Sequence, residues 1–209
     1  MNGIIDARVE KYMDGLLPKR DRVLAEMERY AEQRDVPIIG PAVGRLMYFF
    51  ARLSGAKRIF EMGSAIGYST IWLARAAGPR ARVYYTDGDP ANERRAREYC
   101  RRAGVANRIE FLVGDAVALI DSVPGDFDLI FIDVDKHQYP AAFRKALRRL
   151  RRRGLLITDN TLWYGRVAQA ARDRNTRGVQ RFNRLIYSSR ELFPVIIPLR
   201  DGLAVCQKL

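Results

Sequence analysis

Three polar residues, Asp133, Asp159 and Asn160, are the strongest candidates in this sequence for a chemical role. Asp133 follows the apolar run 128–132, and the pair Asp159-Asn160 follows the apolar run 155–158. Because the carboxyl ends of neighbouring parallel strands meet at one edge of a sheet, we expect these side chains to converge across one crevice. Two carboxylates and one amide oxygen suit Mg²⁺ best, with Mn²⁺ or Ca²⁺ as alternatives, and suit zinc poorly. The competing interpretation is that the aspartates only cap loops.

A glycine-containing turn follows the first apolar run, where the chain reads Glu61-Met-Gly63-Ser-Ala-Ile-Gly67-Tyr-Ser69-Thr70. Gly63 and Gly67 allow a tight turn and a close approach of the backbone to a ligand, and Ser69 or Thr70 can cap the following helix. The G-x-x-x-G spacing differs from the G-x-G-x-x-G of pyrophosphate binders, which disfavours a nicotinamide or flavin dinucleotide. An ordinary strand-to-helix turn is the alternative. Glu61 favours a binding role, because a carboxylate at the end of an apolar strand needs a hydrogen-bonding partner.

Asp87 and Asp115 stand at the corresponding positions after the second and third apolar runs. In a strand–helix–strand unit, an acid at the offset of Asp87 accepts hydrogen bonds from ribose hydroxyls. The alternative is that Asp87 or Asp89 only caps the helix that Pro90 opens. For Asp115 two roles stay open, which are capping its own helix and reaching an adenine amino group.

Short apolar runs alternate with longer amphipathic stretches over most of the chain. The runs predict strands at 58–62, 82–86, 109–113, 128–133 and 155–158, and the stretches between them predict helices at about 68–77, 91–103, 115–121 and 139–151. This alternation, with continuously apolar strands, favours a doubly wound, mostly parallel α/β sheet. Runs at 194–197 and 203–206 flank Asp201-Gly202, so we expect a closing antiparallel hairpin that places one reversed strand at the sheet edge.

Apolar residues recur at helical spacing outside this alternating region as well, and they predict helices at about 21–34, 42–53 and 176–190. The chain contains no repeat and no Ser/Gly-rich linker. The sequence therefore predicts a single domain over residues 1–209, with an N-terminal helical region (1–53) and an α/β core (54–209).

The composition excludes several functional classes. With one His and two Cys in 209 residues, a two-His metal site, a disulfide framework and a cysteine-based zinc site are ruled out. His137 is accompanied by no G-x-S-x-G turn, which argues against a Ser-His-Asp hydrolase. No apolar run approaches the roughly 20 residues of a membrane span, and the N-terminus is charged where a signal peptide would be apolar. We therefore expect a cytoplasmic protein without a membrane partner.

The net charge is +13, from 37 Lys and Arg against 24 Asp and Glu. Such a balance is typical of proteins that bind nucleic acid, and also of proteins that carry many Arg residues on solvated helix faces. Much of the excess lies within predicted helices and at their ends, at 94–102 and 148–153, where cations suit the C-terminal end of a helix dipole. Nucleic acid is therefore the less favoured partner.

Taken together, these motifs resemble the cation-dependent, S-adenosylmethionine-dependent O-methyltransferases, the group that contains the caffeoyl-CoA and catechol O-methyltransferases. The glycine turn alone would indicate only a class I methyltransferase, whereas Asp133-Val-Asp-Lys136 together with Asp159-Asn-Thr-Leu-Trp163 is far more specific. The resemblance implies a Rossmann-like class I methyltransferase fold: a seven-stranded, mostly parallel sheet with a C-terminal antiparallel hairpin and helices on both faces. The matching stretches run in the family's order, at 58–69, 86–90, 114–116, 131–136, 159–163 and 198–203.

The resemblance also implies a role for each matching residue. The cofactor S-adenosylmethionine would be bound by residues at the ends of four strands: Gly63 and Gly67 at its methionine end with Glu61 and Ser69 nearby, Asp87 at the ribose, Asp115 at the adenine, and Asp133, which is shared with the metal. Asp133, Asp159 and Asn160 would ligate the cation, which lowers the pKa of a chelated hydroxyl. Lys136 matches the general base that removes the hydroxyl proton before in-line attack on the sulfonium methyl.

The function expected from this resemblance is methylation of a hydroxyl on a small phenolic vicinal diol, such as a catechol, by a homodimer. Trp163 and Tyr164 could stack on the phenol ring, and core packing is the alternative for both. Two further hypotheses compete. A methyltransferase of the same fold acting on RNA is favoured by the net charge, but it would not need the oxygen ligand set. A binding module without catalysis would be expected to have lost Lys136 or part of that set.

Overall fold

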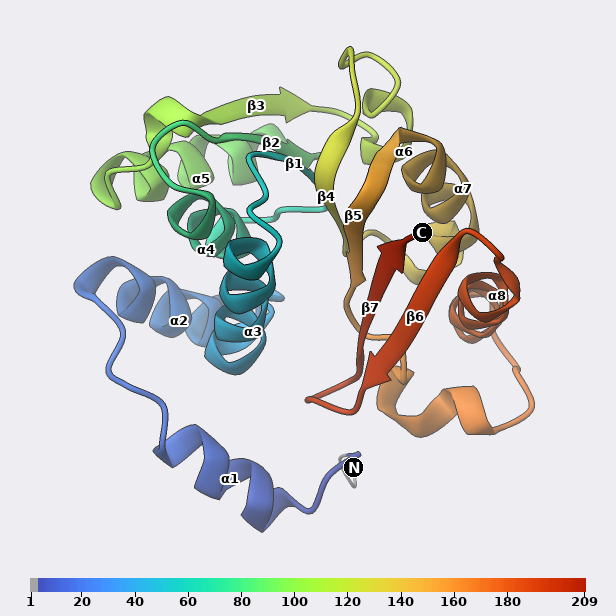
Figure 1. The fold of residues 1–209 in the computed structure, drawn as a ribbon. Coiled ribbons are helices and arrows are strands. Elements are labelled where there is room, and N and C mark those ends of the chain that lie inside the picture. The colour runs from blue at the N-terminus through green and yellow to red at the C-terminus, as the bar shows by residue number, and fades with distance from the viewer. Residues whose placement is uncertain (1–3) are drawn as a thin grey trace.

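The computed structural model describes residues 4–209 and builds them around one seven-stranded sheet (Figure 1). The strand order is β3-β2-β1-β4-β5-β7-β6, and the first five strands of the chain run parallel. The predicted α/β class, with a mostly parallel sheet and a C-terminal antiparallel hairpin, is confirmed. The strands are β1 (Arg58–Met62), β2 (Arg82–Asp87), β3 (Ile109–Val113), β4 (Phe127–Ile132), β5 (Leu150–Thr158), β6 (Leu192–Ile197) and β7 (Leu203–Lys208).

The reversed strand does not lie at the edge of the sheet, so that expectation is wrong. β7 pairs antiparallel with both β5 and β6, which places it inside the sheet and makes β6 the edge strand. Burial explains this order, because the first four residues of β7 are buried whereas Phe193 and Val195 of β6 are exposed. Pro194 also fits an edge position, since it has no N–H to donate to a further strand.

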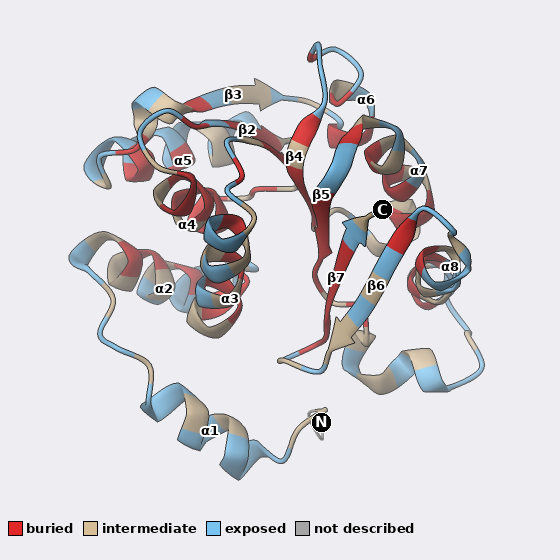
Figure 2. Ribbon diagram, viewed as in Figure 1, coloured by how far each residue is buried: buried red, intermediate tan, exposed pale blue. Residues whose placement is uncertain are grey.

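Helices cover both faces of the sheet, and each face has its own buried apolar cluster (Figure 2). One cluster joins β-strand side chains to α2 (Arg22–Arg34), α3 (Gly40–Leu53), α4 (Tyr68–Ala77) and α5 (Pro90–Arg102). The other joins the alternate side chains of the same strands to α6 (Ala116–Leu119), α7 (Tyr139–Arg149) and α8 (Arg174–Ser188). This alternation follows from the two-residue period of a strand. Within residues 4–209, no helix combines the length and apolar character needed to cross a membrane.

Two further elements differ from the sequence-based expectation. β5 begins at Leu150 rather than at residue 155, so Arg151 to Arg153 belong to a strand and not to the end of α7. Helix α1 (Ala7–Gly15) was not predicted; it buries none of its residues and extends away from the body of the molecule (Figure 1). Three short 3₁₀ helices complete the fold: η1 (Ala106–Arg108), η2 (Lys136–Gln138) and η3 (Trp163–Ala168).

Candidate active site

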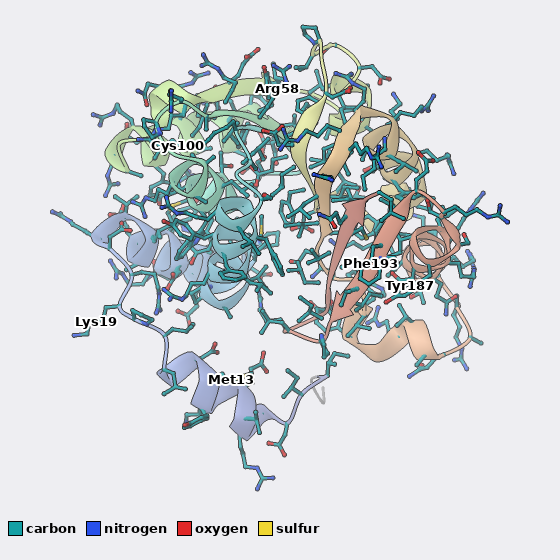
Figure 3. All side chains as sticks on the ribbon, viewed as in Figure 1. Met13, Lys19, Arg58, Cys100, Tyr187 and Phe193 are labelled. Atoms are coloured by element: carbon teal, nitrogen blue, oxygen red, sulfur yellow. The ribbon has the colours of Figure 1, made fainter. Side chains whose placement is uncertain are left out.

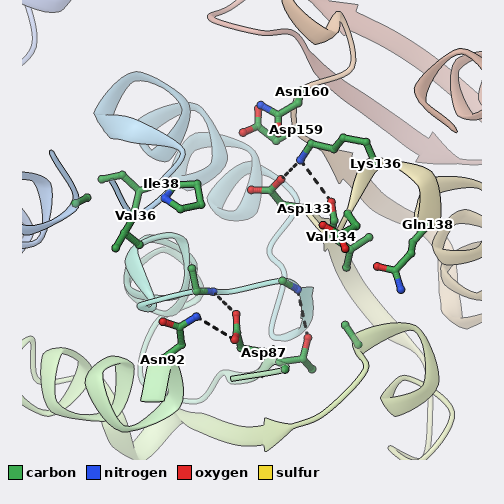
Figure 4. Close-up of a pocket in the computed structure, with 18 of the residues that line it drawn as sticks. Val36, Ile38, Asp87, Asn92, Asp133, Val134, Lys136, Gln138, Asp159 and Asn160 are labelled. Atoms are coloured by element: carbon green, nitrogen blue, oxygen red, sulfur yellow. Dashed lines mark hydrogen bonds and ion pairs between the residues drawn. The ribbon is translucent and has the colours of Figure 1, made fainter. Parts of the chain in front are cut away.

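A cleft of about 1300 Å³ opens at the carboxyl ends of the parallel strands (Figure 4). The loops that follow β1 to β5 line it, and the segment between α2 and α3 forms the opposite wall. Pockets for a single small molecule commonly measure roughly 300–1000 Å³. This cleft therefore has room for a cofactor and an acceptor at the same time.

Asp133, Asp159 and Asn160 lie together on one side of this cleft (Figure 4). Ile132 pairs with Thr158 in the sheet, so the two acids stand directly beyond the ends of adjacent strands. The backbone N–H of Asp159 donates to the carbonyl of Ile132 at 3.2 Å, which continues the pairing by one residue. Asn160 adopts a left-handed conformation with φ of 52°, a region that Asn tolerates better than most residues. The predicted convergence of these three residues is present in the structure.

The chemistry of this donor set fits a hard divalent cation. Burial and the neighbouring charge of Asp133 together raise the pKa of Asp159 to about 7, so this space disfavours the charged form of Asp159. A cation held there would favour that charged form. The third oxygen comes from the Asn160 amide. Residues 4–209 hold no group of three or more His, Cys, Asp or Glu side chains arranged for a metal ion, so the set contains only two carboxylates.

Lys136 lies at the start of η2 and reaches into the same side of the cleft. Its Nζ is 2.7 Å from Asp133 Oδ1 and 3.4 Å from the carbonyl of Val134. The ammonium also sits over two aromatic rings, 5.2 Å from the Tyr139 centroid and 5.8 Å from the Trp163 centroid. The ion pair with Asp133 and the contacts with the two rings hold Nζ at one place beside Asp133. An amine at this position can exchange a proton with a bound hydroxyl.

The turn after β1 approaches the end of β4 closely. Gly63 has a φ of 84°, and a Cβ at this residue would lie only 2.3 Å from the carbonyl oxygen of Asp133. The residue at this position must therefore be glycine, both for its conformation and for lack of space. Through this contact, the turn after β1 and the loop that carries Asp133 touch each other.

Glu61 is fully buried beneath this turn. Thr70 Oγ1 donates to Glu61 Oε2 at 2.5 Å, whereas Oε1 has no hydrogen-bond partner in the described part of the chain. Burial raises the pKa of Glu61 to about 7, although the hydroxyls of Ser69, Thr70 and Ser64 lower it. Neither Ser69 nor Thr70 caps α4, whose N-cap is Gly67 without a side-chain hydrogen bond.

Asp87 holds the glycine turn to β2. Its Oδ2 accepts the N–H of Ala65 at 2.9 Å, and its Oδ1 accepts the N–H of Asp89 at 2.8 Å and Asn92 Nδ2 at 3.1 Å. The N-cap of α5 is Asp89, so Asp87 has a different role from capping that helix. Asp115 does cap α6 by accepting the N–H of Val117 at 3.0 Å, and it also lines the cleft.

The residues predicted from the sequence fall into two groups. Seven of them line the cleft: Gly63, Asp87, Asp115, Asp133, Lys136, Asp159 and Asn160. The other three, Glu61, Gly67 and Ser69, are buried and do not belong to the lining. The structure therefore places the second group behind the cleft wall, where it supports the glycine turn.

Sequence reasoning missed the opposite wall of the cleft. The segment from Asp35 to Ile38 lines it, and Arg200 ties this segment to the β6–β7 turn by donating to the carbonyls of Ile38 and Ile39. Pro37 and Pro41 marked only a break between two helices, and no local pattern indicated that this break faces the cleft. Of the two aromatic candidates, Tyr164 lines the cleft and is 54% exposed, whereas Trp163 packs against the apolar cluster beneath α7 and α8.

The lining of the cleft is acidic, in contrast to the whole chain. Two cations, Lys136 and Arg200, stand in it against eight carboxylates: Glu28, Glu32, Asp35, Asp87, Asp115, Asp133, Asp135 and Asp159. Clefts lined by one sign of charge concentrate ligands of the opposite sign. The site is thus suited to cations and disfavours polyanions, even though the net charge is +13.

Comparison with known proteins identifies relatives along nearly the whole chain. Residues 18–209 match the model of a family described as O-methyltransferase. A catechol O-methyltransferase of Niastella koreensis is 31% identical over 217 residues, which cover 98% of this chain and 98% of that protein.

Solved structures show the same relationship in three dimensions. An O-methyltransferase from Bacillus cereus in complex with SAH superposes with a TM-score of 0.88 at 28% identity, and the match covers 97% of each chain. The O-methyltransferase TomG from Streptomyces achromogenes, involved in tomaymycin synthesis and solved in complex with SAM, also gives a TM-score of 0.88, at 29% identity and 96% coverage of each chain.

Proposed function

Since the chain belongs to the family of class I S-adenosylmethionine-dependent O-methyltransferases, we propose that it methylates one hydroxyl of a small, catechol-like vicinal diol with the help of a divalent cation. The observation that carries this proposal is the convergence of Asp133, Asp159 and Asn160 beside Lys136 in one cleft. Carboxylate and amide oxygens at one place form a ligand set for a hard cation. The name of the Niastella relative supports the catechol class.

The cofactor is assigned to the part of the cleft formed by the loops after β1, β2 and β3. We assign the space beside Gly63 to the methionine end of the cofactor. The Asp87 carboxylate is assigned to the ribose hydroxyls, and Asp115 is assigned to the adenine. Behind this wall, Glu61, Gly67 and Ser69 keep the glycine turn in place. Asp133 belongs to both the cofactor side and the metal side, because its backbone touches Gly63 and its side chain faces Asp159 (Figure 4).

The cation is assigned to Asp133, Asp159 and Asn160, with Mg²⁺ as the first choice and Mn²⁺ or Ca²⁺ as alternatives. When bound, it supplies positive charge that lowers the pKa of a chelated hydroxyl. Lys136 is assigned as the base that takes the hydroxyl proton at Nζ, since this atom lies beside Asp133 within the same side of the cleft. The walls on either side fix the acceptor relative to the cofactor, which is the main requirement for in-line methyl transfer.

Two features support a small phenolic acceptor over RNA. The exposed ring of Tyr164 lines the cleft and offers a face on which a flat phenol can stack. The carboxylates of the lining repel a phosphate backbone, so the excess positive charge of the chain lies elsewhere than at the site. RNA stays the second candidate because of that excess charge alone.

We also propose that the protein is a homodimer. Exposed apolar side chains occur on α3, at Phe49 and Leu53, and on the edge strand β6, at Phe193 and Val195. Phe193 is labelled in Figure 3, on the strand at the outer edge of the sheet. Edge strands with exposed apolar side chains favour pairing with another chain, and a second copy would cover this surface.

The test is methyl transfer from labelled S-adenosylmethionine to a panel of vicinal diphenols, with Mg²⁺ and with EDTA. Transfer that EDTA abolishes supports the cation-assisted reaction and leaves only the identity of the diol to be found. Transfer that EDTA does not affect contradicts the assignment of Asp133, Asp159 and Asn160. Transfer to RNA instead of to diphenols would replace the first candidate by the second.

The variant Asp159→Ala makes the same test at one residue. We expect it to abolish cation-dependent turnover, because the cation loses its most buried carboxylate, while cofactor affinity stays within a few-fold of the wild type. Turnover that persists in Asp159→Ala and is still sensitive to EDTA would remove Asp159 from the ligand set.

A further inference from the structure

Asp201 is a buried carboxylate in the turn between β6 and β7, and its side chain bonds to the loop after β5. It is 7% exposed, and its Oδ1 accepts the backbone N–H of Tyr164. The carbonyl of Asp201 accepts the N–H of Leu162 at 2.9 Å, and the carbonyl of Gly202 accepts the N–H of Thr161 at 2.9 Å. The turn is therefore bonded along the loop that follows β5.

This loop begins with Asn160 and is held in an unfavourable backbone conformation. Asn160, Trp163 and Tyr164 have φ values of 52°, 46° and 53°, and Arg200 in the adjoining turn has a φ of 49°. Left-handed residues other than glycine persist only where the surrounding structure fixes them. The hydrogen bonds that Asp201 and Gly202 accept from this loop supply that constraint. These hydrogen bonds therefore fix the backbone from which the Asn160 side chain extends.

The second carboxylate oxygen of Asp201 lacks a partner. Oδ2 is buried and accepts no hydrogen bond from any residue of the described chain 4–209. Burial raises the pKa of Asp201, whereas the Tyr164 N–H, the charges of Lys136 and Arg200, and the neighbouring Asn160 amide lower it. A buried carboxylate oxygen without a donor costs free energy, so its environment needs an explanation. The Asn160 amide neighbours this carboxylate, because the next residue, Thr161, donates its N–H to the carbonyl of Gly202.

An amide side chain has one accepting end and one donating end, and a cation accepts only the oxygen. An ionised carboxylate can only accept hydrogen bonds, so a carboxylate beside Asn160 selects which end of the amide faces it. Groups that orient metal ligands in this way commonly change metal affinity by roughly 10- to 100-fold.

We propose that Asp201 is a positioning residue whose unpartnered Oδ2 accepts a hydrogen bond from Asn160 Nδ2 when the cation is bound, so that Asn160 Oδ1 is presented to the cation. The inference rests on the proposed function, because it presupposes the cation site. It adds a fourth residue to that site, and this residue acts through Asn160 and does not contact the cation.

The test is a double-mutant cycle between residues 201 and 160, with the dissociation constant of Mn²⁺ as the readout. Free Mn²⁺ is measured by electron paramagnetic resonance on the full-length protein, so no turnover is required. Asp201→Asn keeps an oxygen for the Tyr164 N–H but can also present an NH₂ group to Asn160. Asn160→Asp replaces the amide by a carboxylate, which offers an oxygen in either orientation.

We expect Asp201→Asn to weaken Mn²⁺ binding about 10- to 100-fold when residue 160 is Asn, and by less than about threefold when residue 160 is Asp. Affinity for S-adenosylhomocysteine should stay within about twofold in all variants. Asp201→Ser takes the place of Asp201→Asn in the cycle if the latter does not fold, with the same expected pattern.

Asp173→Asn is the matched control. Asp173 caps α8 by accepting the N–H of Thr176 at 2.8 Å, and the substitution removes the same charge away from the cleft lining. We expect this variant to bind Mn²⁺ within about twofold of the wild type. An equal loss in Asp173→Asn would assign the effect to net charge and overturn the proposal.

The remaining outcomes separate the inference from the proposed function. If the wild-type protein binds no Mn²⁺, the cation site and the inference both fall. If the wild type binds Mn²⁺ and Asp201→Asn binds it equally well, the inference alone is overturned. It is also overturned if Asp201→Asn weakens binding equally in both backgrounds, because Asp201 would then act by charge or through the loop and not by orienting the amide.

Discussion

Asp87 has a structural role in the glycine turn, and we propose that it also binds the cofactor. Its carboxylate accepts three hydrogen bonds, from Ala65, Asp89 and Asn92, and it also lines the cleft. We expect Asp87→Ala to weaken S-adenosylhomocysteine binding about 10- to 100-fold at any cation concentration, since hydrogen bonds to a charged group contribute about 1.5–3 kcal/mol each. Isothermal titration calorimetry with and without Mg²⁺ measures this change.

The control is Asp89→Ala, two residues away. Asp89 caps α5 by accepting the N–H of Ala91 at 2.7 Å and is not part of the cleft lining. Its loss should lower the free energy of unfolding by about 1 kcal/mol and leave cofactor affinity within about twofold. Unchanged affinity in Asp87→Ala would reduce Asp87 to the structural role.

Glu61 makes the stability of the cofactor-free protein depend on pH. Its pKa is raised from 4.5 to about 7 by burial, so the folded state binds the proton more tightly than the unfolded state does. The stabilisation is fully present below pH 4.5 and is lost as the pH rises through 7. Glu61→Gln stays neutral at all pH values and should gain up to about 3 kcal/mol over the wild type between pH 5 and pH 8.

Urea denaturation at pH 5, 6, 7 and 8 measures this difference. Asp159, whose pKa is also raised to about 7, titrates in both proteins. The difference between wild type and Glu61→Gln therefore isolates Glu61. A constant difference across this range would show that the carboxyl of Glu61 is not the group responsible.

At the scale of elements, the contact between the β1 turn and the end of β4 can be tested by adding one methyl group. A Cβ at Gly63 would lie 2.3 Å from the Asp133 carbonyl, and the backbone there is left-handed. We expect Gly63→Ala to lower the free energy of unfolding by about 2–5 kcal/mol, from the combined cost of overpacking and of the left-handed conformation. Chemical denaturation measures this loss.

Gly104→Ala separates the two causes. Gly104 has a φ of 69°, but a Cβ there would meet no atom within 4 Å. Its loss should be about 1–2 kcal/mol, from the conformation alone. Equal losses at both positions would mean that the Gly63 turn can move away from Asp133, and the two loops would not be rigidly connected.

The elements of this fold differ in how far the sequence could predict them. β1 and β3 were predicted to the residue, because each is a short, mostly apolar run between helical stretches and therefore gives a sharp pattern. The start of β5 was missed since Arg151 to Arg153 are exposed and carry no apolar signal. The position of β7 inside the sheet could not be predicted from local sequence. Burial against the rest of the sheet decides which strand of the hairpin pairs with β5.

The same distinction holds for the site. Residues at strand ends could be found because parallel strands bring their carboxyl ends to one edge. Asp201, Arg200 and the segment from Asp35 to Ile38 could not be assigned, since their contacts join parts of the chain that are far apart in sequence. Asp201 had been interpreted only as a hairpin signal.

At the scale of the whole molecule, the exposed apolar side chains of β6 test the proposed homodimer. Phe193 is 64% exposed and Val195 is 45% exposed, and both lie on one face of the edge strand. We expect Phe193→Lys together with Val195→Lys to convert a two-chain species to one chain in sedimentation equilibrium at micromolar concentration. Charged side chains on an edge strand oppose pairing.

Val113→Lys is the matched control, because Val113 is as exposed as Val195 and lies on β3 at the opposite edge of the sheet. This variant should sediment like the wild type. A wild-type protein that sediments as one chain would contradict the homodimer, and a dimer that survives the β6 substitutions would move the interface to another surface.

The acidic lining of the cleft has a consequence for repeated turnover. S-adenosylmethionine carries a net positive charge because of its sulfonium, and S-adenosylhomocysteine is neutral once the methyl group has left. A lining rich in carboxylates attracts the positively charged S-adenosylmethionine and has no such net attraction for the neutral S-adenosylhomocysteine. The proposed cofactor site therefore discriminates between fresh and spent cofactor by charge, and we expect product inhibition to be relieved most at low ionic strength, where screening is weakest.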